Sequence, residues 1–289
     1  MKKFLCSLLL SYLLLPIFAV ANVSYTKLVV FGDSLSDNGN LYKNTHHRAP
    51  NPPYYKGRFS NGPVWVEVLS TQLNIPLEDY AVGGAQTSGG YFKDIRSQIN
   101  AYLKAENSLD PQNLYIIWGG GNNYFFHPQR EISWVNETIL DLKIAITKLA
   151  QRGAKVFLIP NLPALEASPW AIAQDTAAKN NDYTQHMAVL IQAHNAQLKT
   201  AVVDLENNLP IKIIYFDVYA LFKDAILHPQ KYALKNIHQA CYEGNFRGEL
   251  DKPVCKDPQN YLFWDVIHPT AGVHQYIEVI VAKLIKENN

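Results

Sequence analysis

The stretch that decides the fold is residues 27–36, Lys-Leu-Val-Val-Phe-Gly-Asp-Ser-Leu-Ser. Its first five residues form a short apolar run with β-branched side chains, closed by a glycine, and this pattern predicts a buried strand. A continuous apolar run is typical of a parallel strand that is covered on both faces. The polar residues behind it would then lie at the carboxyl end of the strand, where ligands bind in open α/β sheets.

Four similar runs predict the rest of the sheet. They lie at residues 78–82, 114–118, 155–159 and 211–216. Between them, apolar residues recur at helical spacing. The stripes that we expect to be buried are Ile95, Ile99, Tyr102 and Leu103; Val135, Ile139, Leu142, Ile146 and Leu149; Met187, Ile191, His194, Leu198 and Leu205; and Val273, Ile277, Ile280, Val281 and Leu284. Strands alternating with helices predict a three-layer α/β fold around a five-stranded parallel sheet, with irregular excursions at 40–61, 160–176 and 227–262.

The composition excludes several other classes of protein. With 48% hydrophobic residues and a formal net charge of +1, the chain lacks the low hydrophobicity and high charge of a disordered protein. Its 26 Lys and Arg are balanced by 25 Asp and Glu, so no basic excess indicates a nucleic-acid partner. No internal repeat is visible, which argues against a solenoid or propeller.

The first 21 residues have the pattern of a secretory signal peptide. Lys2 and Lys3 precede an apolar stretch over residues 4–18, and Ala19-Val-Ala21 matches an A-x-A cleavage site. The apolar stretch is shorter than the roughly 20 residues that a membrane-spanning helix needs. We therefore expect a secreted protein, extracellular or periplasmic, in which residues 22–289 form one domain.

Export changes what the cysteines are expected to do. Cys6 would be removed with the signal peptide, which leaves Cys241 and Cys255. An even pair in an oxidising compartment favours a disulfide, and two unpaired buried cysteines are the alternative. Residues 242–254 are polar and contain glycine and proline, which is typical of a surface loop.

Residues with catalytic potential follow the predicted strands. They are Ser34 after the first strand, Gly83 and Gly84 after the second, Asn122 and Asn123 after the third, and Asp265 and His268 before the last helix. Serine becomes a nucleophile when a base takes its proton, and that base works best when a carboxylate orients it. Asp265 and His268, three residues apart, supply both parts from one turn.

The developing oxyanion of an ester also needs hydrogen-bond donors. The backbone N–H groups of Ser34 and Gly84 and the side-chain amide of Asn122 are suitable. Each motif alone also fits an ordinary turn, but all of them together predict a serine esterase. No cofactor motif and no set of metal ligands is recognisable, so we expect neither.

These motifs resemble the blocks of the GDSL or SGNH hydrolase family. The matching segments are residues 30–39, 80–85, 120–123 and 265–268, and residues 57–67 are similar to the lipase-type branch of the family. The resemblance implies a three-layer, flavodoxin-like SGNH hydrolase fold. It implies a triad of Ser34, Asp265 and His268, and oxyanion donors at Ser34, Gly84 and Asn122, with Gly83 as the alternative to Gly84. Asn123 departs from the aspartate that is usual there.

Within that family the chain looks like the secreted bacterial branch of glycerophospholipid:cholesterol acyltransferases and lysophospholipases A. This resemblance implies a secreted serine ester hydrolase that releases fatty acid from lysophospholipids through an acyl-enzyme on Ser34. Phospholipid is a second substrate and cholesterol an alternative acyl acceptor. A carbohydrate acetylesterase and a non-catalytic domain that binds lipid or glycan remain as alternatives.

Two further expectations concern partners. We expect transient contact with a membrane surface, and activation by a protease that cuts in the loop 242–254, with a plain stabilising role for the disulfide as the alternative. The aromatic residues Tyr54, Tyr55, Phe59, Phe125 and Phe126 would either line an acyl groove or pack in the core.

Overall fold

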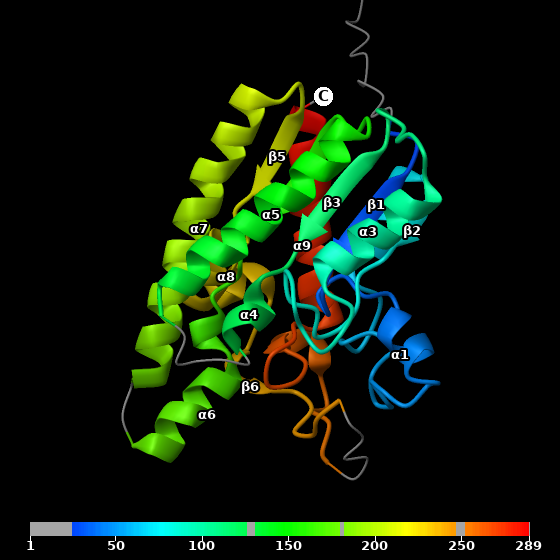
Figure 1. Ribbon diagram of the computed structural model, residues 1–289. Coiled ribbons are helices and arrows are strands. Elements are labelled where there is room, and N and C mark those ends of the chain that lie inside the picture. The colour runs from blue at the N-terminus through cyan, green and yellow to red at the C-terminus, as the bar shows by residue number, and fades with distance from the viewer. Residues whose placement is uncertain (1–24, 126–130, 180–181, 247–251, 289) are drawn as a thin grey trace, which may run out of the picture.

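Five parallel strands form the central sheet. They are β1 (Leu28–Gly32), β2 (Leu77–Asp79), β3 (Leu114–Trp118), β4 (Val156–Pro160) and β5 (Lys212–Phe216). Their order is β2-β1-β3-β4-β5, and every neighbouring pair is parallel (Figure 1). This is the flavodoxin-like order. The predicted α/β fold with a five-stranded parallel sheet is therefore confirmed.

The computed structural model describes residues 25–125, 131–179, 182–246 and 252–288. The predicted signal peptide, residues 1–21, lies outside the described residues.

Helices cover both faces of the sheet. One face carries α3 (Ile95–Ala105), α5 (Ser133–Gln151) and α7 (Asp182–Asn208), and the other carries α2 (Trp65–Leu73), α8 (Val218–Leu227) and α9 (Ala271–Glu287). Figure 1 shows α5 and α7 in front of the sheet and α9 behind it. Alternate residues of β1 enter the two cores: Val29 and Phe31 pack on one side, Leu28 and Val30 on the other. The strand is thus buried on both faces, as its continuous apolar run predicts.

The three excursions contain more regular structure than the sequence predicts. They include α1 (Asn40–Asn44), α6 (Pro169–Ala178), the short 3₁₀ helices Leu165–Ala167, Pro229–Tyr232 and Pro258–Asn260, and two strands, β6 (Asn236–Ala240) and β7 (Tyr261–Phe263). β6 and β7 pair in parallel as a separate small sheet. β6 was not predictable because its residues are mostly exposed or half-buried and show no apolar alternation.

The second predicted strand is shorter than expected, because β2 ends at Asp79 and not at residue 82. The chain nevertheless stays beside β1: the N–H of Tyr80 donates to the carbonyl of Val30, and that of Val82 to the carbonyl of Gly32. The glycines that follow are therefore held next to the end of β1.

The order in which successive strands join the sheet reverses between β1 and β3. β2 lies on one side of β1, and β3, β4 and β5 follow on the other. In doubly wound sheets, ligands bind outside the carboxyl ends of the strands at such a reversal. Ser34 follows β1 there, and Asn122 lies in the short helix α4 (Gly121–Phe125) that follows β3.

Cys241 and Cys255 form the predicted disulfide. Cys241 is buried with the aromatic rings of Tyr54, Tyr242 and Trp264, and we call these four residues the disulfide cluster. Tyr242 and Val254 form an antiparallel bridge inside the disulfide loop.

Candidate active site

Ser34, His268 and Asp265 form a continuous hydrogen-bonded chain. The Oγ atom of Ser34 lies 2.9 Å from Nε2 of His268. On the other side of the ring, Nδ1 of His268 lies 2.7 Å from Oδ2 of Asp265. All three side chains are buried, at 8%, 6% and 2% exposure. The structure thus brings the three predicted residues together in the order that their predicted roles of nucleophile, base and orienting carboxylate require.

Asp265 is held by donors on both carboxylate oxygens. Its Oδ1 accepts the N–H groups of Ile267 and His268 at 2.8 and 2.7 Å. Its Oδ2 accepts the phenol of Tyr54 at 2.6 Å in addition to the imidazole of His268. Burial alone would raise the pKa of Asp265, but the adjacent imidazole and these hydrogen bonds outweigh it and lower the pKa below its usual value. The carboxylate is therefore ionised and can hold a proton on Nδ1 of His268.

The small sheet fixes the turn that carries Asp265 and His268. β7 leads directly into Trp264, whose N–H donates to the carbonyl of His268 at 2.7 Å. Thr270 then closes the turn by donating its N–H to the carbonyl of Leu262. α9 begins at the next residue, so both catalytic candidates lie in a turn clamped between β7 and α9.

The turn after β1 positions Ser34. A side chain on Gly32 would lie 2.4 Å from the carbonyl oxygen of Trp118, so only glycine allows β1 and β3 to end this close together. The carbonyl of Asp33 accepts the N–H groups of Ser36 and Asp37, which makes a tight turn around the serine. Burial raises the pKa of the Asp33 carboxyl to about 6.

The structure distinguishes the two glycines after β2. The N–H of Gly83 donates to Oδ2 of Asp37 at 2.7 Å, so this donor is already engaged. Gly84 has a positive φ of 77° and lines the same cavity as Ser34. Within the described ranges, no hydrogen bond engages the N–H of Gly84 or of Ser34. This supports Gly84 rather than Gly83 as a donor to a ligand in the cavity.

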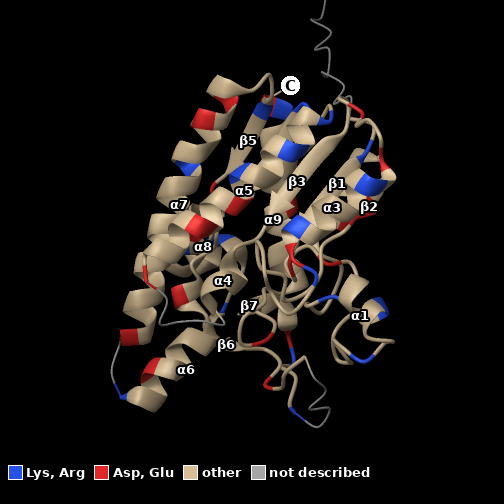
Figure 2. Cartoon of the chain, in the orientation of Figure 1, with Lys and Arg blue, Asp and Glu red and all other residues tan. Residues whose placement is uncertain are grey.

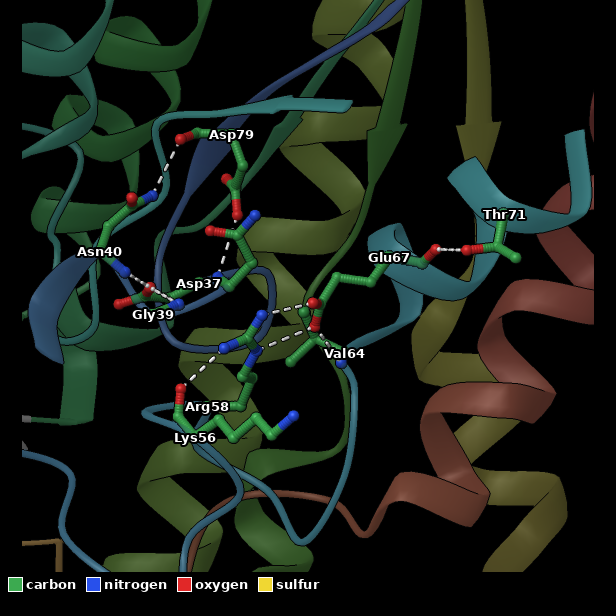
Figure 3. Close-up of polar contacts among 10 residues, drawn as sticks. Asp37, Gly39, Asn40, Lys56, Arg58, Val64, Glu67, Thr71 and Asp79 are labelled. Atoms are coloured by element: carbon green, nitrogen blue, oxygen red, sulfur yellow. Dashed lines mark hydrogen bonds and ion pairs between the residues drawn. The ribbon is translucent and has the colours of Figure 1, made fainter. Parts of the chain in front are cut away.

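Asp37 ties the loops around Ser34 together. Its carboxylate accepts the N–H groups of Gly39, Asn40, Leu41 and Gly83. Figure 3 shows the Asp37 carboxylate next to Gly39 and Asn40. It also shows how this loop contacts β2, where the Asn40 amide donates to the carbonyl of Asp79. The segment from Asp37 to Leu41 therefore fixes the Gly83-Gly84 turn relative to Ser34.

Asn122 and Asn123 differ in their surroundings. The Asn122 amide nitrogen donates to the carbonyl of Ala85 at 2.9 Å, and lies 3.4 Å from Oδ2 of Asp33. The second distance is longer than a usual hydrogen bond, so one N–H of this amide is only weakly engaged. Asn123 is buried and bonded to Thr87 and Thr138, where it links α4 to neighbouring segments.

A cavity with mainly apolar walls contains Ser34, His268, Gly84 and Asn122. Its apolar lining comes from many segments: Leu35, Leu41, Phe59, Phe92, Phe125, Leu162, Pro163, Ala164, Leu165, Phe222, Phe246, Phe263, Ile267 and Pro269. Phe246 belongs to the disulfide loop, so that loop contributes to the wall of the cavity. Such a cavity suits a hydrocarbon chain whose ester lies at the polar end.

The aromatic loop residues lie in different surroundings, and only some of them line the cavity. Phe59 and Phe125 line the cavity, as expected for an acyl groove. Tyr54 is instead buried against Asp265, a contact that its local sequence does not indicate. Tyr55 is not among the residues that line the cavity, and Phe126 lies outside the described residues.

The sequence model of one protein family, the GDSL-like lipases/acylhydrolases, matches residues 28–278 of this chain. This chain belongs to that family. Membership confirms the predicted class of enzyme, an ester hydrolase of the GDSL type.

Three relatives indicate the branch of the family to which this GDSL enzyme belongs. The phosphatidylcholine-sterol acyltransferase of Aeromonas hydrophila is 30% identical, with 99% of this chain and 98% of that protein covered. The thermolabile hemolysin of Vibrio parahaemolyticus is 29% identical over 91% of this chain, and the secreted effector protein SseJ of Salmonella typhimurium 31% over 90%. The chain spans 64% of the length of each of these last two proteins. The acyltransferase-like branch of the family, predicted from the sequence, is confirmed.

Solved structures confirm the fold of this GDSL enzyme. A GDSL-like lipase from Parabacteroides merdae has a TM-score of 0.53 at 12% identity and covers 91% of this chain and 97% of its own. LAE5, an alpha/beta hydrolase enzyme from the Lake Arreo metagenome, has a TM-score of 0.52 at 14% identity and covers 91% and 96%. At these identities the likeness shows the fold alone. In the part of the chain that the structure describes, no helix is both long and apolar enough to cross a bilayer.

Proposed function

We propose that this protein is a lysophospholipase A that forms an acyl-enzyme on Ser34, with transfer of the acyl group to a sterol as a second outcome. The observation that carries the proposal is the hydrogen-bonded chain from Ser34 through His268 to Asp265 at the polar end of an apolar cavity. A non-catalytic lipid-binding domain would not need this series of hydrogen bonds.

The residues divide the reaction into two similar halves. Oγ of Ser34 bonds to the ester carbonyl carbon while its proton passes to Nε2 of His268, and Asp265 stabilises the imidazolium. The N–H groups of Ser34 and Gly84 and the amide of Asn122 stabilise the oxyanion. The ester C–O bond then breaks, and the leaving alcohol takes the proton from Nε2. Water or a sterol hydroxyl repeats these steps on the acyl-enzyme.

The cavity supports a long-chain acyl group. Leu162, Leu165, Phe125 and Phe222 provide an apolar wall that an acetyl group would not fill. A fatty-acyl chain gains about 0.8 kcal/mol for each buried methylene, so this wall favours long acyl chains over acetyl esters. The lining thus argues against a carbohydrate acetylesterase. The name of the Aeromonas relative, a phosphatidylcholine-sterol acyltransferase, supports a glycerophospholipid substrate and a sterol acceptor.

We propose further that the protein is secreted and acts at a membrane surface. The pattern of residues 1–21 supports export, as does the name of the Salmonella relative, a secreted effector protein. A water-insoluble phospholipid would have to reach the cavity from a lipid surface.

The test is an assay of the mature protein on lysophosphatidylcholine, phosphatidylcholine and short acetyl esters, with and without cholesterol, in which every product is quantified. We expect fatty acid from lysophosphatidylcholine, cholesteryl ester when cholesterol is present, and loss of both in Ser34→Ala and His268→Ala. Turnover that persists in Ser34→Ala would remove the acyl-enzyme assignment. A preference for acetyl esters would replace the lipid substrate with a small acyl group.

A further inference from the structure

Tyr54 contacts the catalytic carboxylate from a loop far away in the sequence. Its phenol donates to Oδ2 of Asp265 at 2.6 Å, across 211 residues of chain. The same oxygen lies 2.7 Å from Nδ1 of His268. Tyr54 is 4% exposed and Asp265 2%, so water does not compete for this hydrogen bond. One carboxylate oxygen is therefore shared between the imidazole and the phenol.

The disulfide cluster holds the ring of Tyr54 in this orientation. The ring makes edge-to-face contacts with Tyr242 and Trp264, at centroid distances of 5.6 and 6.1 Å. Tyr242 follows Cys241 directly in the chain, and Trp264 precedes Asp265. The phenol is therefore fixed by the packing of its own ring, since these neighbours limit its rotation.

The backbone near Tyr54 is fastened to the turn that carries Asp265 and His268. Oγ of Ser60 donates to the carbonyl of Pro269 at 2.9 Å, and the side-chain oxygen of Asn61 accepts the N–H of Ala271 at 2.8 Å. Arg58 adds a paired contact to Glu67 of α2, which Figure 3 shows. Residues 54–61 therefore lie along residues 265–271 and are anchored on both sides.

We propose that Tyr54 is a positioning residue for the triad, which holds Oδ2 of Asp265 against Nδ1 of His268. The proposal rests on the proposed function, because it assigns a role within the same reaction. Oδ1 is fixed by two backbone N–H groups, whereas Tyr54 is the only donor to Oδ2, apart from the imidazole itself, among the residues that the structure describes. Without the phenol, the carboxylate keeps its place but loses the donor that orients Oδ2.

The central experiment is Tyr54→Phe, which removes one oxygen atom and leaves the packed ring. We expect kcat on a p-nitrophenyl ester to fall about 10-fold with KM nearly unchanged, because a hydrogen bond to a charged group is lost. Tyr232→Phe is the matched control: Tyr232 also donates its phenol to an aspartate, but that aspartate, Asp224, is not part of the proposed triad. We expect this control to keep the wild-type kcat.

A double-mutant cycle separates positioning from general support of the fold. In an Asp265→Ala background, Tyr54→Phe should cause no further loss, since the group through which it acts is absent. A wild-type kcat in Tyr54→Phe, or an equal loss in both backgrounds, would overturn the proposal. If wild-type activity survives Ser34→Ala, the proposed function fails instead, so the two failures are distinguishable.

Two readouts are insensitive to a purely structural role. The titratable groups that face the Asp265–His268 pair are Tyr54, Asp33 and His274, and Tyr242 faces Tyr54. Tyr54→Phe removes a donor to the ionised carboxylate, so the acidic limb of kcat/KM should move to higher pH. The downfield proton resonance of His268 Nδ1–H should also shift, which needs no turnover. If neither the acidic limb of kcat/KM nor the Nδ1–H resonance changes in Tyr54→Phe, Tyr54 is not a positioning residue.

Discussion

The adjacent residues Asn122 and Asn123 offer a sharp test of the proposed oxyanion site, because only one of them lines the cavity. In Asn122→Ala, the amide that faces the cavity is lost. The structure shows one of its N–H groups anchored on Ala85 and the other only weakly engaged by Asp33. This amide is thus held in place before any ligand arrives, which is the condition for strong transition-state stabilisation.

The magnitudes differ between the two variants. Removal of one preorganised oxyanion donor lowers kcat by about 100- to 1000-fold, with a smaller effect on KM. Asn122→Ala also loses one half-buried hydrogen bond, about 1 kcal/mol of unfolding free energy. Asn123→Ala loses three hydrogen bonds, with Thr87 and Thr138, or about 3 kcal/mol, but no group that touches the substrate.

The assay measures kcat and KM on a p-nitrophenyl ester together with urea unfolding for both variants. We expect a large loss of kcat with small loss of stability in Asn122→Ala, and the opposite pattern in Asn123→Ala at a temperature where it remains folded. A near wild-type kcat in Asn122→Ala would transfer the role to the backbone donors. Equal catalytic losses in both variants would mean that α4 acts as a structural unit and that no single amide is responsible.

Three other predictions follow from Asp33 and the disulfide loop. Burial raises the pKa of Asp33 from 3.8 to about 6, so ionisation of Asp33 destabilises the fold as pH rises through this window. Between pH 4.5 and pH 7.5 this loss amounts to about 2 kcal/mol, and urea unfolding at the two pH values should show that Asp33→Asn removes it. Replacement of both Cys241 and Cys255 by serine should lower the free energy of unfolding by about 3 kcal/mol in denaturant titrations, since the bridge joins cysteines that are 14 positions apart in the sequence. Limited proteolysis within residues 242–254 should raise turnover on lipid, because Phe246 of that loop forms part of the cavity wall; a loss of both activity and melting temperature would leave the disulfide a stabilising role alone.

Much of the fold was predictable because the strands are covered on both faces. Leu28, Val29, Val30 and Phe31 are fully buried, so burial imposes an unbroken apolar run that is visible in the sequence. The buried stripes of the helices are visible for the same reason. β6 gave no such signal, because its pairing with β7 satisfies the backbone while its side chains remain largely outside the core.

The candidate site was predictable where a motif sits at a strand end, and not elsewhere. Ser34 and Asn122 follow adjacent strands, so the topology brings them together without further information. The preference for Gly84 over Gly83 required the position of the Asp37 carboxylate, which only the folded loop provides. Tyr54 lies in an excursion without periodicity, and nothing in its local sequence indicates a partner 211 residues away.

The position of Tyr54 gives the disulfide a meaning that loop closure alone does not. Cys241 and Tyr242 are packed with Tyr54 and Trp264 in one cluster, and Tyr54 reaches the carboxylate that orients His268. A disulfide that stabilised the protein only by restricting the unfolded chain could lie anywhere on the surface. In this protein, the Cys241 end of the disulfide is buried in the same cluster as Tyr54. Loss of the disulfide should therefore reduce kcat in the folded enzyme as well as its stability, and this additional loss should disappear when Tyr54 is already phenylalanine. A disulfide variant that is less stable but turns over at the wild-type rate when folded would show that the cluster supports the fold without positioning the triad.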